Sequence, residues 1–230
     1  MSDSSLILKG REIILAVCGG IAAYKSADIC SKLVQRGAGV TVAMTRDAEK
    51  FITPLTFQAL SARPVHTNIF NLLDSSDPQH ISLTERADLM LIAPATANLL
   101  AKVAHGLTDD LVSLIISASA CPVIFCPSMN NRMWENPINQ ENVTKLANLG
   151  YTFLGPEEGW LACRNVGAGR LSDPQSIIDE VTKMLGDPAA MPKPVGPALP
   201  DIPAAERRKI VAQGASPGLQ TRRKKAPEGA

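Results

Sequence analysis

Short apolar runs rich in β-branched residues alternate with segments of helical periodicity along most of this 230-residue chain. The first pair is the run IILAV at 13–17 and, after two glycines, the helical pattern at 21–36, which ends at Gly37. Strands are predicted at 13–17, 40–44, 89–93, 122–126 and 151–154, and helices at 21–36, 55–60, 97–103, 109–118, 139–149 and 174–185. Strands that alternate with helices form right-handed βαβ units and a parallel sheet covered on both faces. The predicted fold class is therefore α/β, a three-layer, doubly wound parallel sheet of the Rossmann type.

The segments that directly follow the predicted strands carry the residues suited to ligand binding. In doubly wound folds, ligands bind beyond the carboxyl ends of the strands. The Gly19-Gly20 turn, Thr45-Arg46 and the segments 94–98 and 127–130 all fall at such ends. We therefore expect these four segments to converge on one edge of the sheet.

The composition changes near residue 186. Segment 186–230 holds eight of the 17 prolines and eight Lys and Arg against four Asp and Glu, although the whole chain has a formal net charge of only +1. The segment lacks periodicity, so we predict one domain at 1–185 and a Pro-rich, basic, disordered tail at 186–230. Its basic runs are interpreted as solvated charge rather than as a site for acidic partners.

The five cysteines and the hydropathy pattern set expectations about the compartment. No CxxC pair or zinc spacing is present, which favours reduced thiols and no metal site. No charged-then-apolar signal arrangement occurs near Met1, and no apolar run approaches the length of a membrane span. We expect a cytoplasmic protein that binds neither membrane nor nucleic acid.

The sequence CPSMNNRMW at 126–134 combines amides with large apolar side chains directly after a predicted buried strand. A surface turn does not need the methionines, and a core does not need the amides. The mixture is typical of a pocket wall, where apolar side chains hold a flat ligand and amides orient it.

Two strand-to-helix turns offer backbone donors to an anion. In CGGIAAYK at 18–25, glycines let the backbone approach a phosphate, although the turn could equally need small residues for packing alone. The pattern is not GxGxxG, and no acidic residue follows the strand at 40–44 to hold a ribose, which argues against a dinucleotide and leaves a mononucleotide such as FMN open. In APATANLLAK at 93–102, Thr96 and Asn98 add side-chain groups, while Thr96 could instead simply cap the helix.

His80 and Cys163 are the candidate acid–base groups. His80 lies just before a predicted short helix, where an isolated His is more often a surface or capping residue. Cys163 lies in GWLACRNVGAGRL, a glycine-punctuated loop of the kind that forms lids. A thiol that is protonated at neutral pH can serve as an acid, but the residues alone favour an inert cysteine.

Taken in order, these segments resemble the homo-oligomeric flavin-containing cysteine decarboxylases. The resemblance runs from about Glu12 to Leu185 and comprises GGIAAYK, His80-x-x-Leu83, PATAN, AKxAxG, DxL, PxMNxxMW and ACxxxGxGR. It implies a flavodoxin-like fold and a homotrimer, or a tetramer of trimers, with FMN bound at the subunit interface.

The resemblance also implies roles for individual residues. His80 and Cys163 would be catalytic, and the substrate would contact Asn130, Met133 and Ala162. FMN would contact Gly19, Gly20, Ile21, Thr45, Ala95, Thr96, Ala97, Asn98, Ser128 and Met129.

The implied reaction is decarboxylation of the small molecule 4′-phospho-N-pantothenoyl-L-cysteine to 4′-phosphopantetheine in coenzyme A biosynthesis. Oxidation of the cysteinyl group would give a thioaldehyde that can accept the electrons released with CO2, and re-reduction of the enethiolate would use Cys163 as the acid. Bacterial bifunctional members continue into a synthetase domain, so a separate phosphopantothenate–cysteine ligase is expected here.

Other readings stay open beside this one. They are a peptidyl-cysteine decarboxylase, a flavin prenyltransferase-like enzyme and a non-catalytic FMN-binding regulatory protein.

The chain departs from the family pattern at three positions. Arg164 stands where the family usually has Gly, directly after Cys163 in the loop that the family uses as a flap over the site. Ser128 replaces an Ala, and Leu99 replaces a Thr. If this position needs a positive φ, either the Arg164 backbone would be strained or the flap would close differently. Alternatively, the Arg164 side chain could contact the substrate phosphate.

Overall fold

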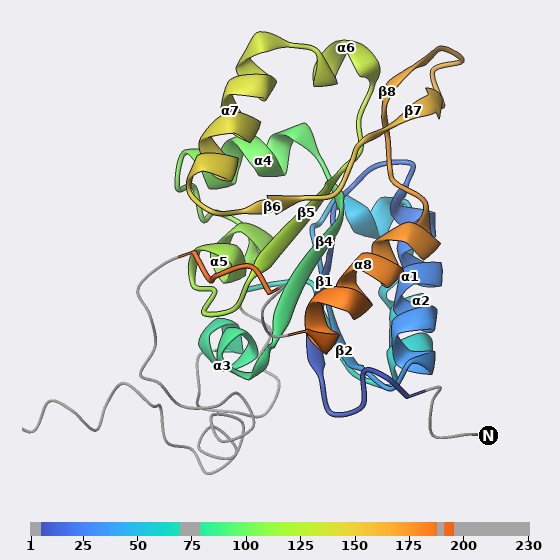
Figure 1. Cartoon of the computed structure of the whole chain (residues 1–230), viewed down its shortest axis with the longest axis vertical. Coiled ribbons are helices and arrows are strands. Elements are labelled where there is room, and N and C mark those ends of the chain that lie inside the picture. The colour runs from blue at the N-terminus through green and yellow to red at the C-terminus, as the bar shows by residue number, and fades with distance from the viewer. Residues whose placement is uncertain (1–5, 70–78, 188–190, 196–230) are drawn as a thin grey trace, which may run out of the picture.

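A parallel sheet of six strands forms the centre of the computed structural model, which describes residues 6–69, 79–187 and 191–195 (Figure 1). The strand order is β3-β2-β1-β4-β5-β6, and every neighbouring pair is parallel. The strands are β1 (Glu12–Val17), β2 (Gly39–Met44), β3 (Val65–His66), β4 (Leu89–Ala95), β5 (Val123–Pro127) and β6 (Thr152–Phe153). Without the short edge strand β3 this is the flavodoxin order, and β3 extends it to the Rossmann order. The predicted doubly wound fold is confirmed.

Helices cover both faces of the sheet (Figure 1). One face carries α1 (Ala23–Gln35), α2 (Pro54–Ser61) and α8 (Pro174–Gly186). The other carries α3 (Gln79–Arg86), α4 (Ala97–Ala104), α5 (Leu111–Ser117) and α7 (Pro137–Asn148). The remaining elements are the 3-10 turn η2 (Ala48–Lys50), the short helix α6 (Asn131–Trp134) and the antiparallel hairpin of β7 (Glu157–Trp160) and β8 (Val166–Arg170).

The alternation of side chains along the strands explains the two cores. In β1, Ile13, Leu15 and Val17 pack with the helices of one face, while Ile14 and Ala16 pack with those of the other. Successive side chains of a strand point to opposite faces, so a strand buried on both sides is apolar throughout. This is why β1 reads as an uninterrupted apolar run in the sequence.

The last helix of the domain, α8, ends at Gly186, one residue after the predicted domain boundary. Helix α8 begins after Asp173, whose side chain caps it by accepting the Gln175 N–H at 2.8 Å, close to the predicted start. Residues 191–195 fall in the segment predicted to be a disordered tail, yet Met191 packs against the core that includes α8. The rest of that segment beyond 195 lies outside the described residues. Among the helices that the structure describes, none has the length and apolarity needed to cross a membrane.

Candidate active site

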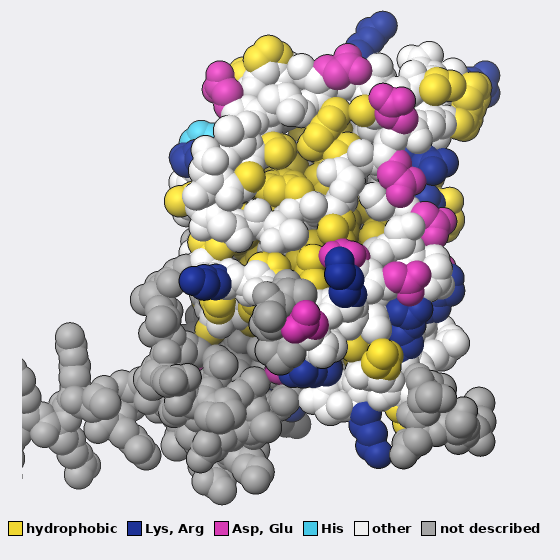
Figure 2. Space-filling model, in the orientation of Figure 1, with side chains coloured by type: hydrophobic (Ala, Val, Ile, Leu, Met, Phe, Trp, Pro, Cys, Tyr) yellow, Lys and Arg dark blue, Asp and Glu magenta, His cyan; other side chains and the backbone are white. Residues whose placement is uncertain are grey.

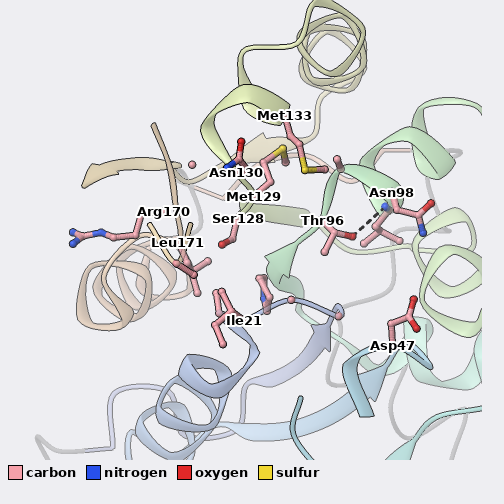
Figure 3. Close-up of a pocket in the computed structure, with 18 of the residues that line it drawn as sticks. Ile21, Asp47, Thr96, Asn98, Ser128, Met129, Asn130, Met133, Arg170 and Leu171 are labelled. Atoms are coloured by element: carbon pink, nitrogen blue, oxygen red, sulfur yellow. Dashed lines mark hydrogen bonds between the residues drawn. The ribbon is translucent and has the colours of Figure 1, made fainter. Parts of the chain in front are cut away.

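A cavity of about 790 Å³ opens at the edge of the sheet where the strands end (Figure 3). All four segments predicted to converge contribute to its lining, and so does the β7–β8 hairpin. Figure 3 shows Met129, Asn130 and Met133 together on one wall, with Asp47 on the far side from them. The parallel sheet brings these segments together because it places the carboxyl ends of its strands side by side.

Most of the predicted site residues line this cavity. They are Gly19, Gly20, Ile21, Thr45, Thr96, Ala97, Asn98, Ser128, Met129, Asn130, Met133, Ala162 and Cys163. Ala95 does not line it, because it is fully buried at the end of β4, where its carbonyl accepts the Ser128 N–H at 3.0 Å. His80 lies within the first turn of α3 rather than before the helix, and its side chain is outside the described part of the structure.

The Gly19-Gly20 turn is shaped by its neighbour Asp47. A Cβ atom at Gly19 would lie 2.5 Å from the Cβ of Asp47, so only glycine fits at this position. Gly20 has room around it, with Thr96 Cγ2 at 4.0 Å as its nearest neighbour. An acidic side chain does lie near the end of the second strand, because Asp47 comes three residues after β2 and lines the cavity. A hydrogen bond from Lys50, at 2.7 Å, lowers the pKa of this carboxyl.

Thr96 begins helix α4. Its Oγ1 accepts the Leu99 N–H at 3.4 Å, shown as the dashed line in Figure 3, so the capping interpretation is confirmed. Beneath the turn, burial raises the pKa of the Cys18 thiol to about 12. Cys18 is consequently an inert, buried thiol rather than a reactive group.

A lysine that was not among the predicted site residues stands on the cavity wall. Lys102 Nζ lies 2.8 Å from Asp109 Oδ1 and 2.7 Å from Asp110 Oδ2. Hydrogen bonds to these carboxylates raise the pKa of Lys102. Asp110 also caps α5 by accepting the Ser113 N–H at 2.8 Å. The AKxAxG and DxL motifs thus meet in one ion-paired cluster, which a linear reading of the motifs does not reveal.

Asn130 and Cys163 come into direct contact. Asn130 Oδ1 accepts the Arg132 N–H at 2.8 Å and caps α6, which turns the amide nitrogen the other way. That nitrogen, Nδ2, donates to Cys163 Sγ at 3.0 Å. Cys163 is exposed, whereas the other four cysteines are buried. The exposed thiol of Cys163 and the amide of Asn130 therefore face each other, and both residues line the cavity.

The loop that carries Cys163 connects β7 to β8. The Arg164 N–H donates to the Leu161 carbonyl at 2.9 Å, which closes the turn. Arg164 itself has a φ of +64°, the left-handed conformation that usually requires glycine. The strain anticipated for this departure from the family pattern is thus present.

The chemistry of the cavity suits an anionic ligand with an apolar body. Lys25 and Arg46 add positive charge to its rim, and the Gly19-Gly20 turn leads into α1. Within the described residues, no group of three or more His, Cys, Asp or Glu is placed to hold a metal ion. Binding and acid–base chemistry by side chains is what this arrangement can supply.

Comparison with known proteins gives concordant matches. A family model described as flavoprotein matches residues 1–186. The chain is 44% identical over 177 residues to a probable phosphopantothenoylcysteine decarboxylase of Streptococcus mutans, with 76% of this chain and 99% of that protein covered. It is 42% identical over 186 residues to the coenzyme A biosynthesis bifunctional protein CoaBC of Bacillus subtilis, with 81% of this chain and 46% of that protein covered. The chain thus spans about half the length of the bifunctional relatives it matches.

Two solved structures share the fold. One is a PPC decarboxylase mutant complexed with pantothenoylaminoethenethiol, with a TM-score of 0.70 and 29% identity, covering 77% of this chain and 99% of the other. The second is the FMN-dependent cysteine decarboxylase SpaF, with a TM-score of 0.68 and 29% identity, covering 78% of this chain and 99% of the other.

Proposed function

The chain belongs to the flavoprotein family, and we propose that it is an FMN-dependent decarboxylase that converts 4′-phospho-N-pantothenoyl-L-cysteine to 4′-phosphopantetheine in coenzyme A biosynthesis. The observation that carries this proposal is the 3.0 Å contact between Asn130 Nδ2 and Cys163 Sγ at the mouth of the cavity. An amide that can orient a substrate and a thiol that can protonate it meet at one place. The relatives named as decarboxylases and the structure holding an enethiol support the same substrate class.

The residues present fit FMN. Gly19 lies so close to Asp47 that a Cβ has no room there, so the turn keeps its backbone bare. The Gly19-Gly20 turn leads into α1, and Lys25, which lines the cavity, lies in the first turn of that helix. Backbone N–H groups at such a turn hold phosphate well. Thr45 and the segments 96–98 and 128–129 would complete the flavin contacts. When bound, FMN supplies a two-electron acceptor for the cysteinyl group and returns the same electrons after CO2 is lost, so that no external donor is needed.

The side chains of the chain have distinct tasks in this scheme. Asn130 would bind the carboxylate and amide of the substrate, and Met133 with Ala162 would form the apolar wall around it. Loss of CO2 breaks a carbon–carbon bond, and its electron pair is accepted by the thioaldehyde, which becomes an enethiolate. Cys163 would then donate the proton that completes the reduced product. Positioned acids contribute about 10²–10⁴-fold to such steps.

The assembly and its surroundings belong to the same proposal. Ile21 and Tyr24 line the cavity, yet each is 61% exposed, which supports coverage by another copy of the chain. Figure 2 also shows hydrophobic side chains gathered across the upper half of one face, around α4 and β6. We propose a homotrimer, or a tetramer of trimers, in the cytoplasm.

The test is the mass of the product after the protein is incubated with 4′-phospho-N-pantothenoyl-L-cysteine. Wild-type protein should form 4′-phosphopantetheine and CO2. His80→Asn should keep its yellow FMN and lose CO2 release, while His105→Asn, which alters a His bonded to its own helix through Ala101, should remain active. Absence of any decarboxylated product from FMN-loaded wild-type protein would refute the proposed function and direct attention to peptidyl cysteines.

A further inference from the structure

The proposed amide and acid are carried by separate parts of the chain. Asn130 follows β5 at the sheet edge, whereas Cys163 lies at the tip of the β7–β8 hairpin, 33 residues later. The hairpin pairs with itself and not with the six-stranded sheet. Its position over Asn130 must therefore be set by contacts along its length.

Strand β8 lies directly against the segment that carries Asn130. The Met129 N–H donates to the Gly169 carbonyl at 2.9 Å. A Cβ atom at Gly169 would overlap the Met129 carbonyl oxygen, and one at Gly167 would lie 3.0 Å from the Cβ of Asn131. Residues two apart in a strand share a face, so two glycines present a bare backbone surface to the segment beneath.

We propose that Gly169 is a positioning residue: its close contact with Met129 fixes the height of the hairpin so that Cys163 reaches the reacting carbon beside Asn130. This inference rests on the proposed function and adds a residue that it does not use. Gly169 has a φ of +142°, so both its conformation and its lack of a side chain are required. It acts through Cys163 and need not touch the substrate.

The reaction step that depends on this positioning is the last proton transfer. The proton leaves Cys163 Sγ for the carbon skeleton of the product, and the thiolate that remains is reprotonated by solvent. The two electrons that reduce the product together with this proton are those that the cysteinyl group gave up in the first oxidation. An alanine at 169 must lift the hairpin by on the order of 1 Å to relieve the overlap with backbone, and a misplacement of that size costs about 10²-fold in rate.

The experiment compares Gly169→Ala with Gly159→Ala in the full-length, FMN-loaded protein. Gly159 lies in the same hairpin and also has a positive φ, +158°, but its added Cβ would meet only the flexible guanidinium of Arg170, at 3.1–3.2 Å. In a single turnover under anaerobic conditions, Gly169→Ala should release the enethiol, two hydrogens lighter than 4′-phosphopantetheine, and leave the visible flavin absorbance bleached. Gly159→Ala should give the complete product. KM should stay within a few-fold in both.

A second readout does not depend on turnover. Cys163 is the only exposed cysteine among the described residues, so iodoacetamide reports on it selectively. Loss of the Asn130 contact should raise its alkylation rate several-fold in Gly169→Ala and not in Gly159→Ala. If wild-type protein makes no decarboxylated product, the proposed function fails, but this rate still tests the positioning.

Several results would overturn the positioning role. They are complete product at the wild-type rate from Gly169→Ala, an unchanged alkylation rate, or equal damage in both glycine variants. Should Gly169→Ala not fold, Gly167→Ala provides a milder displacement, since its Cβ would approach a side-chain carbon and not backbone. It should shift the product ratio in the same direction by a smaller factor, and no shift would contradict the proposal.

Discussion

Arg164 holds a backbone conformation that is costly for its side chain. A left-handed φ costs a non-glycine residue roughly 1–2 kcal/mol, and replacement by glycine removes this cost. Glycine also has more conformational freedom in the unfolded chain, which reduces the gain in stability by about 0.5–1 kcal/mol. We therefore expect Arg164→Gly to raise the free energy of unfolding by about 0.5–1 kcal/mol, measured by denaturant titration. Among the residues that the structure describes, Ala62 is the other non-glycine residue with a positive φ (+53°), and Ala62→Gly is the matched control that should gain a similar amount. A loss of stability in Arg164→Gly would mean that the arginine side chain makes contacts that offset its strain.

At the scale of the elements, the hairpin is tied to the domain through Glu157. Its Oε2 accepts from Arg170 at 2.9 Å and its Oε1 accepts the Asp173 N–H at 3.1 Å. The hydrogen bond from Arg170 is the main reason that the pKa of Glu157 is lowered. A carboxyl whose folded pKa is depressed stabilises the protein above its ordinary pKa of about 4.5, and that contribution is lost as the pH falls through the folded pKa. Because the pair is partly exposed, its contribution is small, about 0.2–1 kcal/mol.

The expected consequence is loosening of the hairpin in acid before the sheet responds. Hydrogen exchange of the β7 and β8 amides, corrected for the intrinsic pH dependence, should accelerate as the pH falls below about 4.5 and through the lowered pKa of Glu157. Glu157→Gln should show the faster exchange already at pH 6, whereas Glu180→Gln, which removes an exposed pair with Lys183 on α8, should not. Hairpin exchange that is independent of pH in the wild type would show that the glycine contacts alone hold it in place.

At the scale of the whole molecule, the cavity presents apolar side chains to solvent that a second copy of the chain would cover. We expect sedimentation to give a mass three or twelve times that of the chain. Tyr24→Glu, which puts a charge at the exposed cavity rim, should shift the protein toward monomer and reduce the FMN retained after gel filtration. Leu149→Glu, an equally exposed apolar position beyond α7, should leave both unchanged. A monomeric wild type that keeps its FMN would contradict the assembly.

The sheet and its helices could be predicted because apolar periodicity is a local property. Strands β1, β2, β4 and β5 begin and end within two residues of their predicted bounds, since each is largely buried and reads as a mostly apolar run. The β7–β8 hairpin could not be predicted in this way. Its strands, EEGW and VGAGR, carry glycines where β-formers are usual, and at Gly169 the strand lies against the backbone of Met129.

The cavity could be located from the sequence, but not all of its contacts could. The rule that ligands bind beyond strand ends was enough to bring Gly19, Thr45 and Thr96 together. Lys102 and Asp47 needed the structure, because their roles depend on neighbours that lie in other segments. The Asn130–Cys163 contact joins two motifs that are distant in the sequence. It depends on how the β7–β8 hairpin packs on the domain, which no local sequence pattern predicts.

The fold and the site are completed at different points along the chain. The six-stranded sheet has all its strands once Phe153 has been made, but the cavity is not closed until Leu171 is present. Because domains fold from the N-terminus during synthesis, a nascent chain can hold a nearly finished sheet while its binding site still lacks a wall. Ligand capture by this protein is therefore expected late in its synthesis. A chain cut between these two points would lack the β8 wall of the cavity and also α8, whose buried side chains belong to one of the two cores.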